Sequence, residues 1–429
     1  MIWTVLDTWI VVIGALCAAA CSIPGTILVL RKMSLMGDAI SHTVLPGIAV
    51  AFLVTGSRDP FAMLIGAVVV GVLTAFLVQA IHSLGNVEVG ASMGIVFTVL
   101  FAFGLVLMRQ AIDHVDIDPD CVLYGAIELA WFDQVQVAGF EVPRGVVVNG
   151  VMLIANVILM LLFYKEFKIT SFDPALAHSQ GIRPSLMHYL LMTMTAATAV
   201  AAFETVGSIL VVAMFIVPPA TAYLLTDRLG VLFIMSIGIA VLAAIIGHLG
   251  AITIPTWFGF SGTSTAGAMA VATGVLFVCA WICSPRHGVL SRSWHQLSIR
   301  LTIIREDILG ILWRLEERSN QSIQPAHMSI AIGAAPMMIR FALRSLQRQG
   351  NVIRHKEHWQ LTEMGRTRAT SLVRSHRLWE VYLDKHYPQD SNQLHHSASR
   401  LEHVTTDEIQ SFLGDASKDP HGSKVPEDE

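Results

Sequence analysis

Long apolar stretches recur through the first two thirds of this chain, and they restrict its fold more than any other feature. A helix that crosses a bilayer needs about 20 mostly apolar residues. Such stretches lie near residues 8–30, 35–55, 61–82, 93–111, 145–164, 186–205, 207–226, 229–249 and 264–283. Gly207 and the pair Pro218-Pro219 interrupt region 186–226, which leaves open whether it forms two full spans. The sequence therefore predicts an all-α polytopic membrane protein with about eight or nine transmembrane helices.

The composition changes near residue 285. Charged residues make up 14% of the chain, against about 25% in average soluble proteins. Residues 1–283 are nearly free of charge, whereas residues 295–429 resemble an ordinary soluble protein. Pro285 and Gly288 mark a break between the two parts. We therefore predict a transmembrane domain (1–285), a linker (286–300), a winged-helix-like domain (301–365) and a helical region (366–429).

The basic residues at the ends of the spans predict the orientation, because such residues concentrate on the cytoplasmic side. With the N-terminus outside, the majority fall on one side: Arg31, Lys32, Lys165, Lys168, Arg183, Arg228, Arg286 and Arg292. We therefore expect a multi-pass protein of the cytoplasmic (inner) membrane whose C-terminal domain lies in the cytoplasm.

Two ionisable residues, Asp38 and His42, lie within the second apolar stretch. Because they are four residues apart, they share one face of a helix. Ionisable groups are costly inside a span and by default indicate a functional site. The alternative is an Asp–His pair that ties helices together structurally.

The loop from Lys165 to Ser185 contains signals for a short helix. Asp173 suits the N-cap, Pro174 suits the first helical position, and Gly181 suits the end. A short capped helix between two spans fits docking to a partner protein, and a structured loop without a partner is the alternative.

Three segments resemble the membrane subunits of bacterial ABC importers for manganese, zinc and iron: R-K-M-S-L-M-G-D-A-I-S-H-T-V-L-P-G, F-D-P-A-L-A-x-x-x-G and V-G-S-I-L-V-V-A-M-F-I-V-P-P-A-T-A. The resemblance implies a fold like that of the large type II importers and a metal path lined by Asp38 and His42. It also implies a coupling helix to the ATPase, carried here by Asp173, Pro174, Ala177 and Gly181. Residues 250–263 are bulkier than the short turn of small residues in that family.

The same resemblance implies partners. The chain has no G-x-x-x-x-G-K-[ST] motif, so ATP hydrolysis is expected from a separate ABC ATPase subunit and the chain itself is not expected to be an enzyme. An extracytoplasmic metal-binding protein is expected to deliver the metal, and the permease is expected to form a homodimer or heterodimer. No permanent cofactor is expected, because the divalent metal is the substrate and an effector of the tail. Carboxylate and imidazole ligands fit Mn²⁺, Fe²⁺ and Zn²⁺ alike.

The tail has the pattern of a winged helix. Residues 303–318 and 335–349 have helical periodicity, and N-V-I-R-H-K-E-H-W-Q-L-T fits two short strands joined by a charged turn. A further helix is predicted over residues 362–386.

The segments L-V-R-S-H-R-L-W-E-V-Y-L, H-H-S-A-S-R-L-E-H-V-T-T-D-E and D-P-H-G-S-K-V-P are similar to the diphtheria-toxin-repressor family of metal-dependent regulators. The resemblance implies one metal site with His376, Glu380 and His395, and a second with Glu402 and His403. Asp307 matches the position where manganese-type members of that family have an Asp. Ser399 stands where the family has Cys, Met or Glu, and Gly310 stands where manganese-type members have a further Glu.

DNA binding is a weaker expectation for the tail. Met337 and Ile339 stand where repressors have hydroxyl residues that face DNA, and apolar side chains cannot donate to phosphates or base edges. Arg340, Arg344 and Lys356 are candidates for contacts with a nucleic-acid backbone. We therefore favour the permease of a metal importer with a metal-sensing or docking tail. The alternative is a metal-dependent repressor that is membrane-anchored or released by proteolysis.

Overall fold

The computed structural model describes residues 3–56, 60–112, 127–137, 139–259, 263–285, 288–319, 325–355, 358–387, 391–414 and 416–426. The chain divides into two compact units, Met1–Ser291 and Arg292–Glu429, which are treated separately below.

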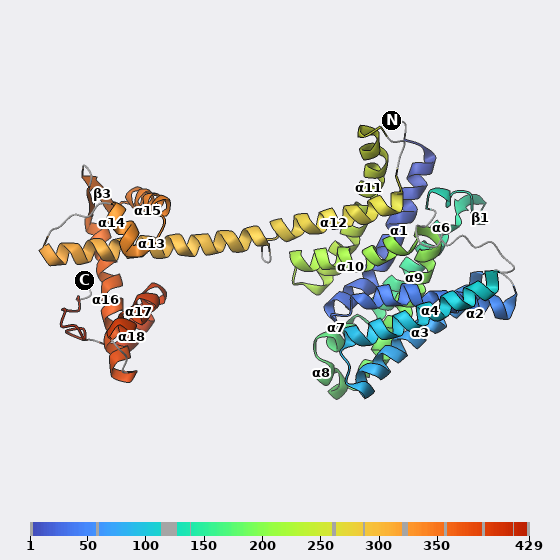
Figure 1. Ribbon diagram of the computed structural model, residues 1–429, viewed down its shortest axis with the longest axis horizontal. Helices are drawn as coiled ribbons and strands as arrows, with labels where there is room; N and C mark the ends of the chain where they lie inside the picture. Colours follow the sequence, from blue (N-terminus) through green and yellow to red (C-terminus); the bar gives the residue numbers. More distant parts are fainter. Residues whose placement is uncertain are drawn as a thin grey trace. The chain divides into compact units, whose positions relative to one another are not determined.

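Nine helices of the first unit's described residues are long and apolar enough to cross a membrane. They are α1 (Val5–Leu30), α2 (Leu35–Thr55), α3 (Pro60–Gly85), α4 (Val89–Ile112), α6 (Arg144–Leu162), α9 (Pro184–Val206), α10 (Ser208–Leu225), α11 (Leu229–Trp257) and α12 (Thr265–Cys283) (Figure 1). The predicted all-α membrane fold is therefore confirmed.

The region 186–226 forms two separate helices. Gly207 has φ +80°, a left-handed value that favours glycine, and it lies between α9 and α10. Pro218 and Pro219 lie inside α10 and are buried without ending it. Helix α11 continues to Trp257, so part of the segment 250–263 that departs from the family pattern is helical.

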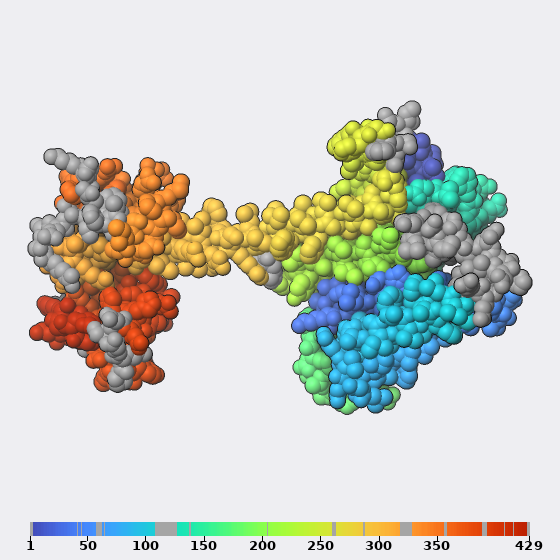
Figure 2. All heavy atoms as spheres, viewed as in Figure 1, coloured from blue at the N-terminus to red at the C-terminus, as the bar shows by residue number. Residues whose placement is uncertain are grey.

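Helix α2 packs closely against α3 and α4 because small residues meet at the contacts. A Cβ on Gly47 would lie 2.5 Å from the carbonyl oxygen of Gly66 on α3. A Cβ on Gly104 of α4 would lie 2.7 Å from Cδ of Pro46. Small residues let membrane helices approach in this way. Figure 2 shows α2 to α4, in blue to cyan, as one continuous surface of the first unit.

The loops of this unit contain short elements. Helices α7 (Tyr164–Phe172) and α8 (Pro174–Ser179) lie between α6 and α9. Strands β1 (Gln134–Val137) and β2 (Phe140–Pro143) pair antiparallel, with Val135 opposite Val142, and η1 (Ile127–Leu129) precedes them. The prediction did not include this hairpin.

The second unit has the predicted winged-helix pattern. Helices α13 (Val289–Ser319), α14 (Pro325–Ile332) and α15 (Pro336–Arg348) precede strands β3 (Val352–His355) and β4 (His358–Leu361), which pair antiparallel. Within the predicted linker 286–300, residues from Val289 on are helical and form the first part of α13.

Three helices and a short turn follow the wing. They are α16 (Glu363–His386), α17 (Ser391–Leu401), η2 (Glu402–Val404) and α18 (Asp407–Leu413). Helix α16 packs against α17 and η2. This packing brings side chains of α16 close to side chains that follow one to two dozen residues later in the sequence.

Candidate metal centres

The pair predicted in the second span comes together on α2. The Nε2 atom of His42 lies 3.4 Å from Oδ1 of Asp38, and the side chains are 27% and 39% exposed. The helical spacing of four residues brings them onto one face, as expected. One carboxylate and one imidazole form a partial ligand set that a passing cation can occupy and leave.

Two aromatic rings of α4 contact the imidazole of His42. The ring centroids of Phe97 and Phe101 lie 5.4 and 5.6 Å from that of His42. These contacts fix the ring on one side, while the partial exposure of His42 and Asp38 leaves the pair accessible. The pair is therefore only partly buried.

The predicted short helix in the loop is α8. Oδ1 of Asp173 accepts from the N–H of Leu176 at 2.9 Å, and Pro174 opens the helix. At the other end Gly181 has φ +80°, and the N–H of Ile182 donates to the carbonyl of Ala177 at 3.0 Å. Ala177 is buried, whereas Leu176 is 46% exposed. The helix is therefore buried at Ala177 and exposes the apolar side chain of Leu176.

In the tail, three predicted ligands converge from α16 and α17; we call them cluster A. Nε2 of His376 lies 3.1 Å from Oε1 of Glu380 and 3.0 Å from Nδ1 of His395. Nδ1 of His395 lies 2.8 Å from the same carboxylate oxygen. Two imidazole nitrogens at this distance need a proton between them, and a divalent cation can take its place.

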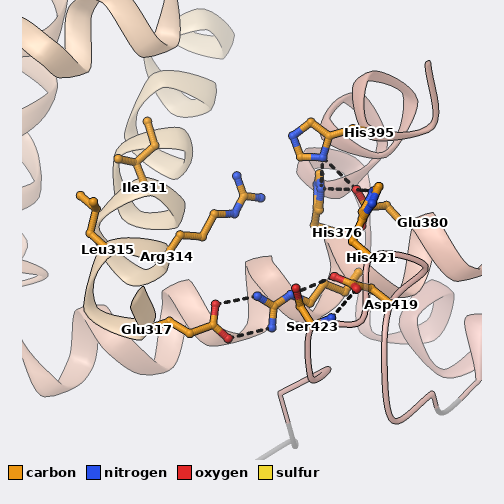
Figure 3. A pocket seen from close by; sticks show the side chains of 11 residues that line it. Ile311, Arg314, Leu315, Glu317, His376, Glu380, His395, Asp419, His421 and Ser423 are labelled. Atoms are coloured by element: carbon orange, nitrogen blue, oxygen red, sulfur yellow. Dashed lines mark hydrogen bonds and ion pairs between the residues drawn. The ribbon is translucent and has the colours of Figure 1, made fainter. Parts of the chain in front are cut away.

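Figure 3 shows cluster A at the wall of a cavity of about 400 Å³, with Ile311, Arg314 and Leu315 of α13 on the opposite wall. His421, which the prediction did not include, lines the same cavity, and its Nε2 lies 3.9 Å from Oε1 of Glu380. Arg377 pairs with Glu317 at 2.7 Å and with Asp419 at 3.6 Å, which holds the loop of His421 against α16.

The side chains of cluster A shift the pKa values of one another. Burial alone would raise the pKa of Glu380, but hydrogen bonds from His376 and His395 outweigh it and lower that pKa to about 2. For His376, burial acts downward, but Glu380 and Glu402 raise its pKa. Glu380 is therefore a carboxylate throughout the physiological range, as a metal ligand must be.

Cluster B joins the second predicted pair, Glu402 and His403, with Asp307, a candidate ligand that the prediction had assigned to neither site. Nε2 of His403 lies 3.4 Å from Oδ1 of Asp307 and 3.8 Å from Oε1 of Glu402. Glu306, which the prediction did not include, lies 2.7 Å from Nδ1 of the same imidazole. Three carboxylates around one imidazole, without a thiolate, fit hard or intermediate divalent metals.

The carboxylates also determine the protonation of His403. Burial alone would lower its pKa, but hydrogen bonds to Asp307 and Glu306 and the charge of Glu402 raise it to about 10. At the position expected to have lost its ligand, the Ser399 hydroxyl donates to the carbonyl of His395 at 3.0 Å within its own helix.

Glu402 contacts both clusters. Its Oε2 lies 2.5 Å from Nδ1 of His376 in cluster A, and its Oε1 faces His403 in cluster B. The prediction assigned Glu402 to the second site alone. A carboxylate on the second nitrogen of a metal-binding histidine orients the ring and raises its basicity.

The other predicted positions are not gathered into a site. Arg340 and Arg344 are exposed on α15, and Lys356 lies outside the described residues. The expectation that Ile339 faces DNA is wrong, because Ile339 is 1% exposed and packs in the core. In the membrane unit, His248 pairs with Asp7 at 3.2 Å and is 2% exposed, so these two residues tie α11 to α1.

Comparisons with known proteins agree with these features. Residues 6–284 match the family "ABC 3 transport family", and residues 362–427 match "Iron dependent repressor, metal binding and dimerisation domain". The manganese transport system membrane protein MntD of Bacillus subtilis is 45% identical over 68% of this chain and 97% of its own length. The zinc transport system membrane protein TroD of Treponema pallidum is 36% identical over 83% of this chain and 96% of its own.

A solved structure gives the same result for the fold. PsaBC from Streptococcus pneumoniae in complex with Fab has a TM-score of 0.55 and 28% identity, over 68% of this chain and 96% of that one. These relatives are transport permeases and do not favour the alternative of a membrane-anchored repressor. The ABC 3 match covers more than half of the sequence, and the chain therefore belongs to the ABC 3 transport family, with a repressor-like metal-binding and dimerisation domain at its C-terminus.

Proposed function

We propose that this chain is the permease subunit of an importer for a divalent transition metal, with Asp38 and His42 as a station on the path. The observation that carries the proposal is this partly exposed carboxylate–imidazole pair, 3.4 Å apart, inside a span of an ABC 3 family member. The names of the two relatives support manganese or zinc as the substrate. Iron remains a prediction.

The partners follow from the same proposal. A separate ATPase supplies the energy and docks at α8, whose exposed Leu176 is an apolar contact point. An extracytoplasmic metal-binding protein delivers the ion, and a second permease chain completes the channel. The basic residues at the span ends support a cytoplasmic location for the tail.

Within the tail, clusters A and B are proposed to bind the imported metal or a related one as an effector. Their donor atoms are imidazole and carboxylate, which fit Mn²⁺, Fe²⁺ and Zn²⁺. Sensing the ion on the side where it is released would allow the tail to adjust transport.

The test measures uptake of Mn²⁺ and Zn²⁺ into vesicles that contain the permease, its ATPase and its binding protein. Asp38→Asn and His42→Gln are expected to abolish uptake while the complex still co-purifies. Thr98→Val on α4 is the matched control, because its exposed hydroxyl donates only within its own helix, to the carbonyl of Gly94 at 2.6 Å. Normal uptake by either path variant would refute the assignment, and loss of assembly would favour a structural role.

A further inference from the structure

Helix α15 has an exposed face that is both basic and apolar. Its opposite face is buried in the core of the winged helix through Ile339, Leu343 and Leu346, each 1% exposed. The outer face carries Met337, Arg340, Phe341, Arg344 and Arg348 at spacings of three and four residues. Met337 is 78% exposed and Phe341 is 60% exposed. We call these five residues the outer face of α15.

The charge of this helix has one sign. Residues 336–348 contain three arginines and neither Asp nor Glu. The packed neighbour α14 adds a further exposed apolar side chain, because Ile330 is 82% exposed. Single exposed apolar residues are ordinary, but two on one turn with three arginines on the same face form the pattern of a helix that lies on a membrane surface.

A nucleic acid fits this face less well. Bases are read by hydrogen-bond donors and acceptors, and the helix places Met337 and Phe341 where such groups are needed. Phosphates would engage the arginines but would leave both apolar side chains in water. An anionic lipid surface satisfies both kinds of side chain, since the headgroups attract the arginines and the acyl boundary accepts Met337 and Phe341.

We propose that the outer face of α15 binds the anionic phospholipid surface of the membrane that the same chain spans. Each arginine close to such a surface strengthens binding about fivefold, so three arginines and two apolar side chains give only weak affinity on their own. Tethering makes that affinity sufficient, because the nine spans hold the tail at an effective lipid concentration in the millimolar range or above. The proposal requires only that the chain is a membrane protein and is independent of metal transport.

The test uses the full chain in nanodiscs that contain a phospholipid with a photoreactive acyl chain. One set of discs contains phosphatidylglycerol and the other only phosphatidylcholine, and adducts are mapped by mass spectrometry. Adducts on the spans serve as the internal standard. We expect adducts on residues 336–348 in the anionic discs, with a loss on the order of 25-fold for Arg340→Gln/Arg344→Gln. Met337→Ser/Phe341→Ser is expected to lose them as well.

Phe412→Ser is the matched control. Phe412 is 74% exposed on α18, but it shares that helix with Asp407 and Glu408 and has no arginine there. Its replacement is expected to leave the α15 adducts unchanged. All substituted side chains are exposed, so the buried face of α15 stays intact in each variant.

Three outcomes would overturn the proposal. If α15 formed no adducts, or if the adduct yield were equal in both kinds of disc, a specific interaction with an anionic surface would be excluded. Tight binding of a DNA duplex by the nanodisc-bound chain, abolished by the arginine variant and without lipid adducts, would assign the face to nucleic acid. Protein cross-links from α15 to α15 would assign it to a second copy.

Discussion

At the scale of single residues, Glu402 is notable because it contacts both clusters of the tail. One carboxylate oxygen lies 2.5 Å from His376 and the other faces His403 at 3.8 Å, so this buried side chain joins clusters A and B. A candidate ligand of cluster B is therefore placed to orient His376, a candidate ligand of cluster A. Loss of such a partner costs roughly 10–100-fold in metal affinity.

We predict that Glu402→Gln weakens both metal sites of the tail, whereas Asp307→Asn weakens only one. The measurement is a Mn²⁺ titration of the full chain in which electron paramagnetic resonance quantifies free Mn²⁺. Every variant also carries His42→Ala, so that the candidate pair on α2 does not contribute to binding. Asp307 contacts His403 but not His376, which makes it the control for simple loss of cluster B. If both variants leave the same single site untouched, Glu402 does not join the clusters.

A second residue-scale prediction concerns pH. The pKa of His403 is raised to about 10 by Asp307, Glu306 and Glu402, so its imidazole is protonated at neutral pH and cannot bind a metal until the proton leaves. Raising the pH removes that proton, and the affinity of cluster B should rise about tenfold per pH unit from 6 to 8. Calorimetry in buffers of different ionisation enthalpy measures the proton released. A pH-independent affinity in this range would contradict the protonation of His403.

At the scale of elements, the capping of α8 sets its rigidity. Asp173 supplies the cap through its contact with the N–H of Leu176, and loss of an N-cap costs about 1 kcal/mol. For a helix of six residues, this is enough to unwind it part of the time.

We predict that Asp173→Ala lowers ATP-driven metal uptake while Asp173→Ser largely preserves it, because serine caps without the charge. The same preparations should be assayed for ATP hydrolysis, which is expected to continue with poorer coupling to uptake. Equal uptake by the Ala and Ser variants would show that the cap does not matter for coupling.

The elements also show what the sequence can and cannot reveal. The spans could be predicted because lipid forces every apolar stretch of that length into a helix, and Gly207 divides α9 from α10 where its left-handed φ is needed. The linker was predicted from Pro285 and Gly288, but no helix breaker follows Gly288, and α13 starts at Val289. Glu306 was missed although it adjoins the predicted Asp307, because the sequence does not show that both neighbouring carboxylates face the imidazole of His403. His421 was missed because a loop brings it to cluster A.

At the scale of the whole molecule, the chain combines a candidate ligand pair inside its spans with two candidate metal clusters in its tail. A path must release its ion, and Asp38 and His42 offer only two ligand side chains. A sensor must retain its ion, and cluster A offers three convergent ligands with His421 close by. This difference in ligand number fits the proposed roles of the pair in transport and of cluster A in sensing.

We therefore predict that metal inside the vesicle lowers uptake through the tail. Right-side-out membrane vesicles loaded with ATP and graded Mn²⁺ measure the initial rate of uptake. Coupling between sites is typically worth about 5–150-fold, so the wild-type rate should fall at least about fivefold as internal Mn²⁺ rises. His376→Ala is expected to keep the metal-free rate and lose the response, whereas His42→Gln has no rate to regulate. His386→Gln, on the same helix but outside cluster A, should respond as the wild type does. A His376→Ala variant that still responds fully would show that cluster A does not sense the imported ion.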